Sequence, residues 1–394
     1  MSLPPLKPFA HAHATHPDAH MALALAAAQI DAQRAQTGLQ PSLGWIYLTE
    51  AFCGAAEGLL AELRQRWPGV AWLGASGPGI CAGGTEYFDE PALALMLAEL
   101  PHEQFQLFSG LQPLGDWQPE LLQVHADPRT PDLQELIAEL AAHSRSGYAF
   151  GGLAAGRGDA LQIADGVWRG GLSGAGFGAG LQLVSRVSQG CQALGPERRI
   201  DACDSGLVTV LDGQPALDCL LQDLALPVTT AGAGLRDALP RMRRTLAGIS
   251  RDDDQQDRRH VRGAGAYGPQ VRVRHLVGID PAKRGVVVAE PLQPGQRLSF
   301  CERSPEAARR DLLRICTELR ALAEDREGGP ARIAGAIYIS CSGRGGPHFG
   351  APNAEAQWVQ HALGDVPMVG FFAGGEIAHA SLHGYTGVLS VFLS

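Results

Sequence analysis

The chain has 394 residues, of which 45% are hydrophobic and 19% charged, and its formal net charge is −9. This length exceeds one typical core and predicts two or three domains, or one intimately packed pair. The composition is that of a globular protein and excludes a disordered or fibrous one. A net negative charge gives no electrostatic footprint for nucleic acid or anionic lipid, so we expect no nucleic-acid or membrane partner.

The eight cysteines are scattered along the chain without any CxxC pair. This spacing excludes a zinc knuckle and a thioredoxin-type motif, and predicts mostly buried thiols. No basic-then-apolar leader is seen, and the alanine-rich stretch 21–30 is interrupted by Gln29 and too short to span a bilayer. We therefore expect a reduced, cytoplasmic protein.

Residues 1–17 are rich in proline, alanine and histidine, and we expect them to form a flexible lead-in to a helix that Asp18 caps. His11 and His13 alternate within this stretch and raise the question of a metal site. Such alternation in a proline-bounded segment is more typical of a loose terminus. We therefore predict no metal site.

A strand, helix, strand and glycine-rich turn recur three times along the chain, each time followed by a returning strand. The expected strand, helix and strand are 44–48, 55–67 and 70–74, then 121–124, 132–143 and 148–152, then 334–339, 355–363 and 366–370. In every copy two glycines stand five residues apart: Gly74 and Gly79, Gly151 and Gly156, Gly370 and Gly375. This spacing suits a turn that needs positive φ or close backbone approach. Three matches in the same context predict an internal duplication.

These units predict an α/β fold of repeated strand-helix-strand-hairpin units, with mixed sheets flanked by helices and arranged as two related domains. The stretch 224–240, with its proline and glycines, is the best candidate for a linker. We expect the first domain to cover residues 18–223 and the second to cover residues 241–394.

Several motifs resemble one known family, the FIST domain proteins, over most of the chain from about residue 20 onward. The most specific motifs are residues 188–196, 341–345, 370–377 and 383–386. The resemblance implies an N-terminal FIST segment followed by a C-terminal one. It also implies a small-ligand sensory module, which in this family is often attached to kinase, chemotaxis or cyclic-nucleotide signalling domains. This chain leaves no room for an output domain, so we expect a separate signalling partner protein whose identity stays open.

The turn after the strand 334–339 offers groups that bind small anions. Arg344 stands among glycines, where its guanidinium and bare backbone N–H groups could meet a carboxylate or phosphate. This chemistry fits an amino-acid-like ligand, whose amine Glu376 could accept. The alternative is structural, with Arg344 bracing Glu376 across the glycine turns.

Two further function classes stay open. Cys341 at the end of its strand could be the nucleophile of an enzyme, with His348, His379 or His383 as its base, or it could be an inert buried thiol. The sequence lacks a nucleophile elbow, which makes an enzyme the weaker reading. The resemblance also allows a haem-dependent gas sensor, although no CxxCH motif singles out a histidine.

The sequence thus predicts a small-ligand-binding sensory protein of intracellular signalling, for an amino-acid-like or other small anionic metabolite. We expect its pocket where the glycine turns of the two domains converge. The expected ligand-binding residues are Cys341, Gly343, Arg344, Gly345, His348, Gly374, Gly375, Glu376, Gly74, Ser76 and Gly152.

Overall fold

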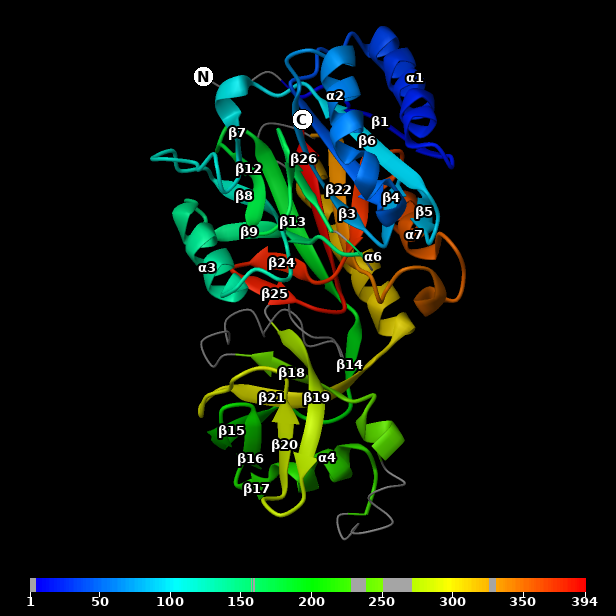
Figure 1. Cartoon of the computed structure of the whole chain (residues 1–394). Coiled ribbons are helices and arrows are strands. Elements are labelled where there is room, and N and C mark those ends of the chain that lie inside the picture. The colour runs from blue at the N-terminus through cyan, green and yellow to red at the C-terminus, as the bar shows by residue number, and fades with distance from the viewer. Residues whose placement is uncertain (1–4, 157, 159, 228–238, 251–270, 326–330) are drawn as a thin grey trace. The chain divides into compact units, whose positions relative to one another are not determined.

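The computed structural model describes residues 5–156, 158, 160–227, 239–250, 271–325 and 331–394, with only the backbone of residues 346 and 347 (Figure 1). The chain divides into two compact units, the first containing residues 1–188 and 312–394 and the second containing residues 189–311. Most of the predicted linker 224–240 lies outside the described residues, since 228–238 are among those omitted.

The first unit contains the three predicted repeats, each a strand, a helix, a strand, a hairpin and a returning strand. The first repeat is β2 (Leu43–Thr49), α2 (Ala56–Arg66), β3 (Ala71–Gly77), β4 (Gly79–Ala82), β5 (Thr85–Phe88) and β6 (Ala92–Ala98). The second is β8 (Leu121–Ala126), α3 (Leu133–His143), β9 (Tyr148–Leu153), β10 (Gln162–Ala164), β11 (Val167–Trp168) and β12 (Leu172–Phe177). The third is β22 (Ile333–Cys341), α7 (Ala354–Leu363), β23 (Met368–Ala373), β24 (Glu376–His379), β25 (Ser381–His383) and β26 (Thr386–Leu393). The predicted repeated units are thus present, with the same order of elements in all three.

The three repeats build three six-stranded sheets on one plan, and each sheet takes its last two strands from another repeat. The orders are β1-β6-β2-β3-β10-β11, β7-β12-β8-β9-β24-β25 and β13-β26-β22-β23-β4-β5. The outer strands are β1 (Ala10–Thr15), β7 (Phe105–Phe108) and β13 (Gln182–Gln189). The hairpin of the first repeat thus joins the third sheet, that of the second joins the first sheet, and that of the third joins the second sheet.

This cyclic exchange of hairpins makes the three repeats one compact body. Backbone hydrogen bonds connect β4 with β23, where Cys81 pairs with Gly370, 289 positions later, and connect β9 with β24, where Gly151 pairs with Ile377, 226 positions later. Removing one repeat would leave sheet edges with unpaired N–H and C=O groups on the other two. The third repeat therefore belongs to the same unit as the first two, although residues 189–311 separate them in sequence.

The predicted flexible lead-in 1–17 is wrong for residues 10–15, which form β1 and pair antiparallel with β6. Ala10, Ala12 and Ala14 are buried, while the alternating histidines are less so. This alternation is that of a half-buried strand. The helix that follows, α1 (Ala19–Thr37), begins as predicted, since the Asp18 carboxylate accepts a hydrogen bond from the backbone N–H of Met21 at 2.9 Å.

Helices cover one face of each sheet, and the other faces meet in a common core. α1 and α2 pack on the first sheet, α3 on the second, and α6 (Pro305–Glu324) and α7 on the third. In the common core, the rings of Tyr47, His125 and Phe371 lie 5.2–5.7 Å apart between centroids. Each comes from a different sheet, so the three layers are in direct contact. The predicted α/β fold with mixed sheets flanked by helices is confirmed.

The first glycine of each repeat lies where two parallel strands pass too closely for a side chain. A Cβ on Gly74, Gly151 or Gly370 would lie 1.6–1.8 Å from the carbonyl oxygen of the residue opposite it on the neighbouring strand. No side chain fits at that distance. The recurring glycines therefore serve strand packing.

The second unit is a small antiparallel barrel. Its strands are β15 (Arg198–Asp204), β16 (Leu207–Leu211), β18 (Leu246–Ser250), β19 (Arg272–Asp280), β20 (Gly285–Val288) and β21 (Arg297–Arg303). Strand β21 pairs with both β15 and β18, which closes the barrel. Two short strands, β14 (Cys191–Ala193) and β17 (Gln214–Pro215), extend it, and α4 (Ala216–Asp223) contributes to its core. The first unit also contains the short helices η1 (Glu50–Ala55), η2 (His102–Gln104) and η5 (Gly346–Phe349).

We expect Gly370→Ala to lower the free energy of unfolding by about 3 kcal/mol or more, because its Cβ would collide with the Tyr338 carbonyl in the middle of the β22–β23 ladder. Urea unfolding followed by circular dichroism measures this. The matched control is Gly54→Ala in η1, where a Cβ meets nothing within 4 Å and the change should stay within about 0.5 kcal/mol. Equal losses for the two variants would contradict the packing role.

Candidate functional site

The candidate site lies at the carboxyl ends of β22 and β23, the parallel pair at the centre of the third sheet. Cys341 is the last residue of β22, and it pairs in register with Ala373, the last residue of β23. Gly374 and Gly375 follow, and Glu376 begins β24. The carboxyl ends of parallel strands commonly carry ligand sites because side chains and turns from several strands meet there.

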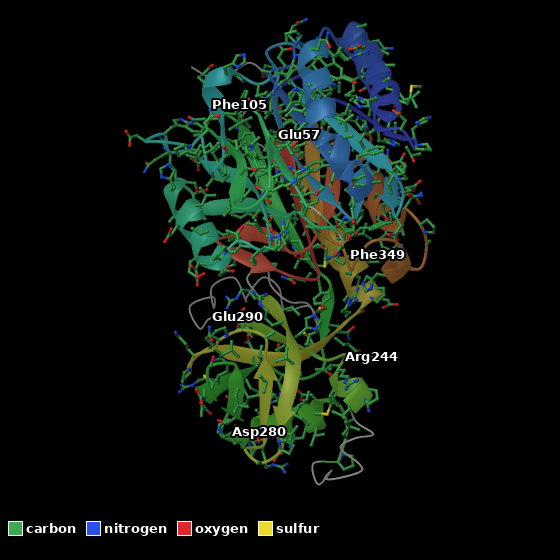
Figure 2. All side chains as sticks on the ribbon, in the orientation of Figure 1. Glu57, Phe105, Arg244, Asp280, Glu290 and Phe349 are labelled. Atoms are coloured by element: carbon green, nitrogen blue, oxygen red, sulfur yellow. The ribbon has the colours of Figure 1, made fainter. Side chains whose placement is uncertain are left out.

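Arg344 is fully buried and its guanidinium is occupied by protein groups. Its Nε and Nη2 lie 3.0 Å from Oε1 of Glu355. Its Nη1 donates to the carbonyl oxygens of Ser188 (3.0 Å) and Tyr385 (3.4 Å), and its Nη2 donates to the Ser188 hydroxyl at 2.9 Å. The ring of Phe349, labelled in Figure 2, lies 5.7 Å from the guanidinium carbon. These contacts account for the five N–H groups of an arginine, which leaves none for a ligand.

The carboxylate that pairs with Arg344 is Glu355 of α7, a residue that the sequence analysis missed. Glu355 is fully buried and also accepts hydrogen bonds from Tyr338 (2.7 Å) and from Ser340 (3.0 and 3.1 Å). The expected bracing of Glu376 by Arg344 is therefore wrong, since the ion pair goes to Glu355. An acidic residue in the first turn of a helix is ordinary, so nothing in the local sequence marks Glu355 as the partner.

Glu376 has an oxygen without a hydrogen-bond partner. Its Oε2 accepts from the backbone N–H of Thr386 at 3.1 Å and from the Thr386 hydroxyl at 2.7 Å. Its Oε1 has no hydrogen-bond partner although the side chain is fully buried. Burial raises the pKa of the Glu376 carboxyl to about 8, while the bonds from Thr386, the charge of Arg344 and the nearby Cys341 thiol act in the opposite direction. A buried polar atom without a partner is rare enough to indicate a functional position.

The Cys341 thiol is a poor nucleophile in this setting. Burial and the nearby Glu376 raise its pKa to about 12, although backbone N–H groups of Gly343 and Tyr385 favour the thiolate. The thiolate is the reactive form of a cysteine, so a raised pKa disfavours the cysteine enzyme that the sequence left open. Cys341 remains partly exposed, next to the exposed Ser342 and Gly343.

The glycine turns of the three repeats do converge, and backbone hydrogen bonds link them. The N–H of Ala155 donates to Ser76 at 3.1 Å, and the N–H of Gly374 donates to Leu153 at 3.1 Å. The hydroxyl of Ser76 accepts from the N–H of Leu161 at 3.0 Å. The predicted residue Ser76 therefore supports the turn of the second repeat.

The other predicted glycines have packing roles. A Cβ on Gly152 would lie 2.7 Å from that of Ala373, and a Cβ on Gly345 would lie 2.1 Å from the ring of Phe88. A Cβ on Gly375 would meet Leu153 at 3.2 Å. His348 lies beside the ring of Phe349, with centroids 4.9 Å apart. Among the predicted site residues, the structure thus brings together, at the carboxyl ends of the strands, the buried Glu376, the partly exposed Cys341 and the exposed Gly343 and Gly374.

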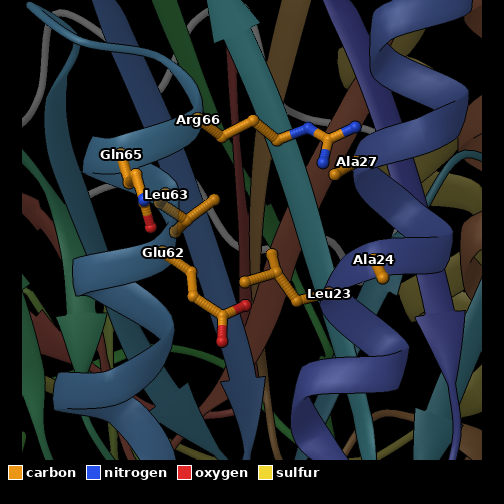
Figure 3. A pocket seen from close by; sticks show the side chains of 7 residues that line it. All are labelled: Leu23, Ala24, Ala27, Glu62, Leu63, Gln65 and Arg66. Carbon is orange, nitrogen blue, oxygen red and sulfur yellow. The ribbon is translucent and has the colours of Figure 1, made fainter.

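A hollow of about 420 Å³ lies between α1 and α2, far in sequence from the candidate site (Figure 3). Its lining residues are Leu23, Ala24, Ala27, Glu62, Leu63, Gln65 and Arg66. Its charged groups are already paired, Glu62 with His20 at 2.5 Å and Arg66 with Asp31 at 2.6 Å. The charged side chains of this hollow are therefore already engaged by neighbouring residues.

Two classes of feature are absent from the described part of the chain. No group of three or more histidine, cysteine, aspartate or glutamate side chains there is arranged to hold a metal ion. Within the same residues, no helix combines the length and apolar character needed to cross a bilayer.

Comparison with known proteins assigns the family. The FIST N domain model matches residues 42–214, and the FIST C domain model matches residues 216–379. The chain belongs to the FIST family. An uncharacterized protein of Mycobacterium tuberculosis is 31% identical over 397 residues, which cover 96% of this chain and 98% of the relative. An uncharacterized protein of Mycobacterium bovis is 29% identical over 413 residues, which cover 96% of this chain and 97% of the relative.

FIST domains are generally regarded as small-ligand sensory domains of signalling proteins. In this FIST protein, the boundary between the two matched segments falls inside the second compact unit. The third repeat belongs to the FIST C segment, yet it shares its sheets with the FIST N segment.

We expect Arg344→Ala to lower the free energy of unfolding by about 3–5 kcal/mol, because it leaves the Glu355 carboxylate buried without its charge partner. Chemical denaturation without any ligand measures this loss. The control is Arg169→Ala, whose exposed side chain faces Glu57 at 3.4 Å and should change stability by about 0.5 kcal/mol or less (Glu57 is labelled in Figure 2). A loss of less than about 1 kcal/mol for Arg344→Ala would contradict the structural role.

The raised pKa of Glu376 predicts a pH dependence of stability. Between about pH 4.5 and pH 8 the folded state keeps a proton on Glu376 that the unfolded chain releases, so stability falls as the pH rises. The slope from this group is at most about 1.4 kcal/mol per pH unit. Urea unfolding of the wild type and of Glu376→Gln at pH 5.5, 6.5, 7.5 and 8.5 measures the contribution of Glu376 to the pH dependence of the free energy of unfolding. If the free energies of unfolding of the two proteins differ by the same amount at every pH, the raised pKa of Glu376 is contradicted.

Proposed function

We propose that this FIST protein is a sensory module for a small, amine-bearing metabolite of the amino-acid class, with Glu376 as the group that accepts the amine. The observation that carries the proposal is the unpartnered Oε1 of a fully buried carboxyl at the strand ends. A ligand ammonium at this position would satisfy the oxygen and stabilise the ionised carboxylate. The sensory character of the family supports the same function.

The surroundings of Glu376 favour a small ligand. The neighbouring Cys341, Gly343 and Gly374 are exposed at least in part, and two of the three carry no side chain beyond the backbone. Bare backbone permits close approach of a ligand. Because the donors of Arg344 are taken, we assign the recognition to the amine rather than to an anionic group of the ligand.

We further propose that the module acts inside the cell and reports to a separate signalling protein. All eight cysteines are free thiols in the structure, and this fits a reducing compartment. The role of a signalling partner rests on the family alone.

Isothermal titration calorimetry with the twenty L-amino acids and simple primary amines tests the proposal. At pH 7 most Glu376 side chains are protonated, so binding of an ammonium should release close to one proton, measured by repeating the titration in buffers of different ionisation enthalpy. Glu376→Gln should weaken binding about tenfold or more, the loss expected for a buried charge-assisted contact.

Glu62→Gln is the matched control, because Glu62 lines the hollow between α1 and α2. It should bind the same amine with unchanged affinity. The proposal fails if no compound of the panel binds, or if Glu376→Gln binds as tightly as the wild type. Loss of binding in Glu62→Gln alone would place the ligand in the hollow between α1 and α2 and would also refute the role of Glu376.

A further inference from the structure

The peptide unit between Tyr385 and Thr386 is held from both sides by the candidate site. Its carbonyl oxygen accepts a hydrogen bond from Nη1 of Arg344 at 3.4 Å. Its N–H donates to Oε2 of Glu376 at 3.1 Å, and the Thr386 hydroxyl adds a second bond to the same oxygen at 2.7 Å. One peptide unit therefore connects the ligand-accepting carboxyl to the buried arginine.

Tyr385 has a backbone φ of 63°, in the left-handed region that residues other than glycine rarely adopt. Such a conformation persists only where surrounding contacts hold it. The bonds from Arg344 and to Glu376 are such contacts. The two bonds fix the orientation of this peptide unit, so losing the bond to Glu376 would remove one of its restraints.

Arg344 also binds Ser188, the residue at which the chain leaves the first unit. It donates to both the carbonyl and the hydroxyl of Ser188, at 3.0 and 2.9 Å. Ser188 is the last residue of the first unit before the chain enters the second. The next residue, Gln189, donates its N–H to the carboxylate of Asp311 at 2.7 Å, and Asp311 is the last residue of the second unit.

We propose that Arg344 is a positioning residue that transmits the occupancy of Glu376, through the Tyr385–Thr386 peptide, to the chain crossing at Ser188. A ligand that draws the Glu376 carboxyl toward its own amine weakens the bonds to Thr386 and releases the peptide. The freed carbonyl of Tyr385 then no longer restrains the guanidinium that holds Ser188. This inference rests on the proposed function, because it takes Glu376 as the ligand contact.

Hydrogen exchange of the full-length chain, measured by mass spectrometry without any ligand, tests the coupling. The proteins compared are the wild type, Glu376→Gln, Ser188→Ala and the double variant, with Thr386→Val as a second, milder perturbation of the same peptide. Glu376→Gln and Thr386→Val should each raise the exchange rate of a peptide covering residues 185–191. In the Ser188→Ala background their effect should shrink about fivefold, since allosteric couplings commonly reach that size.

Ser185→Ala is the matched control, because Ser185 lies on the same strand, β13, and binds the Ser390 hydroxyl at 2.9 Å instead of Arg344. In that background the effect of Glu376→Gln should persist in full. The coupling is refuted if neither perturbation changes exchange in residues 185–191, or if their effects combine independently with Ser188→Ala. Because no ligand is present, failure of amine binding in calorimetry and failure of the coupling are separate results.

Discussion

The three repeats of the first unit exchange their hairpins, so none of the three sheets is built from one repeat alone. Each sheet of the first unit is completed by two strands from another repeat, so backbone hydrogen bonds join β4 to β23, β10 to β3 and β24 to β9. Burying backbone N–H and C=O groups without hydrogen-bond partners costs free energy. A single repeat cannot satisfy all of these groups by itself, because its sheet needs strands from another repeat. The same exchange carries Glu376, at the start of β24, away from its own sheet and onto the second one.

This architecture explains why a buried ion pair lies directly behind the candidate ligand site. Arg344 and Glu355 neutralise each other and bring together β22, α7 and the end of β13, through Ser188. An isolated charge at this depth would be strongly unfavourable, but a paired and fully hydrogen-bonded one is tolerated. Glu376, one peptide unit away, has no such partner for its Oε1, and this difference separates a structural carboxylate from a candidate functional one.

The repeats, their helices and the positions of their glycines were predictable because each follows from local pattern. Periodicity predicts strand or helix, and the glycines five residues apart mark each turn. The roles of those glycines were less predictable. Gly74, Gly151 and Gly370 lie where a neighbouring carbonyl occupies the place of a side chain, which depends on the register between two strands. The strand at residues 10–15 was missed because its partner β6 lies some 80 residues later.

Local sequence patterns were enough to predict the family, the α/β class, the three repeats and a candidate site at the end of β22. Tertiary structure decided which carboxylate pairs with Arg344, which oxygen remains unpaired, and which of the candidate groups is available to a ligand. The physical reason is that ion pairing, burial and the pKa of a side chain depend on neighbours that are distant in sequence. Ser188 lies 156 residues from Arg344, and only the fold places the two in contact.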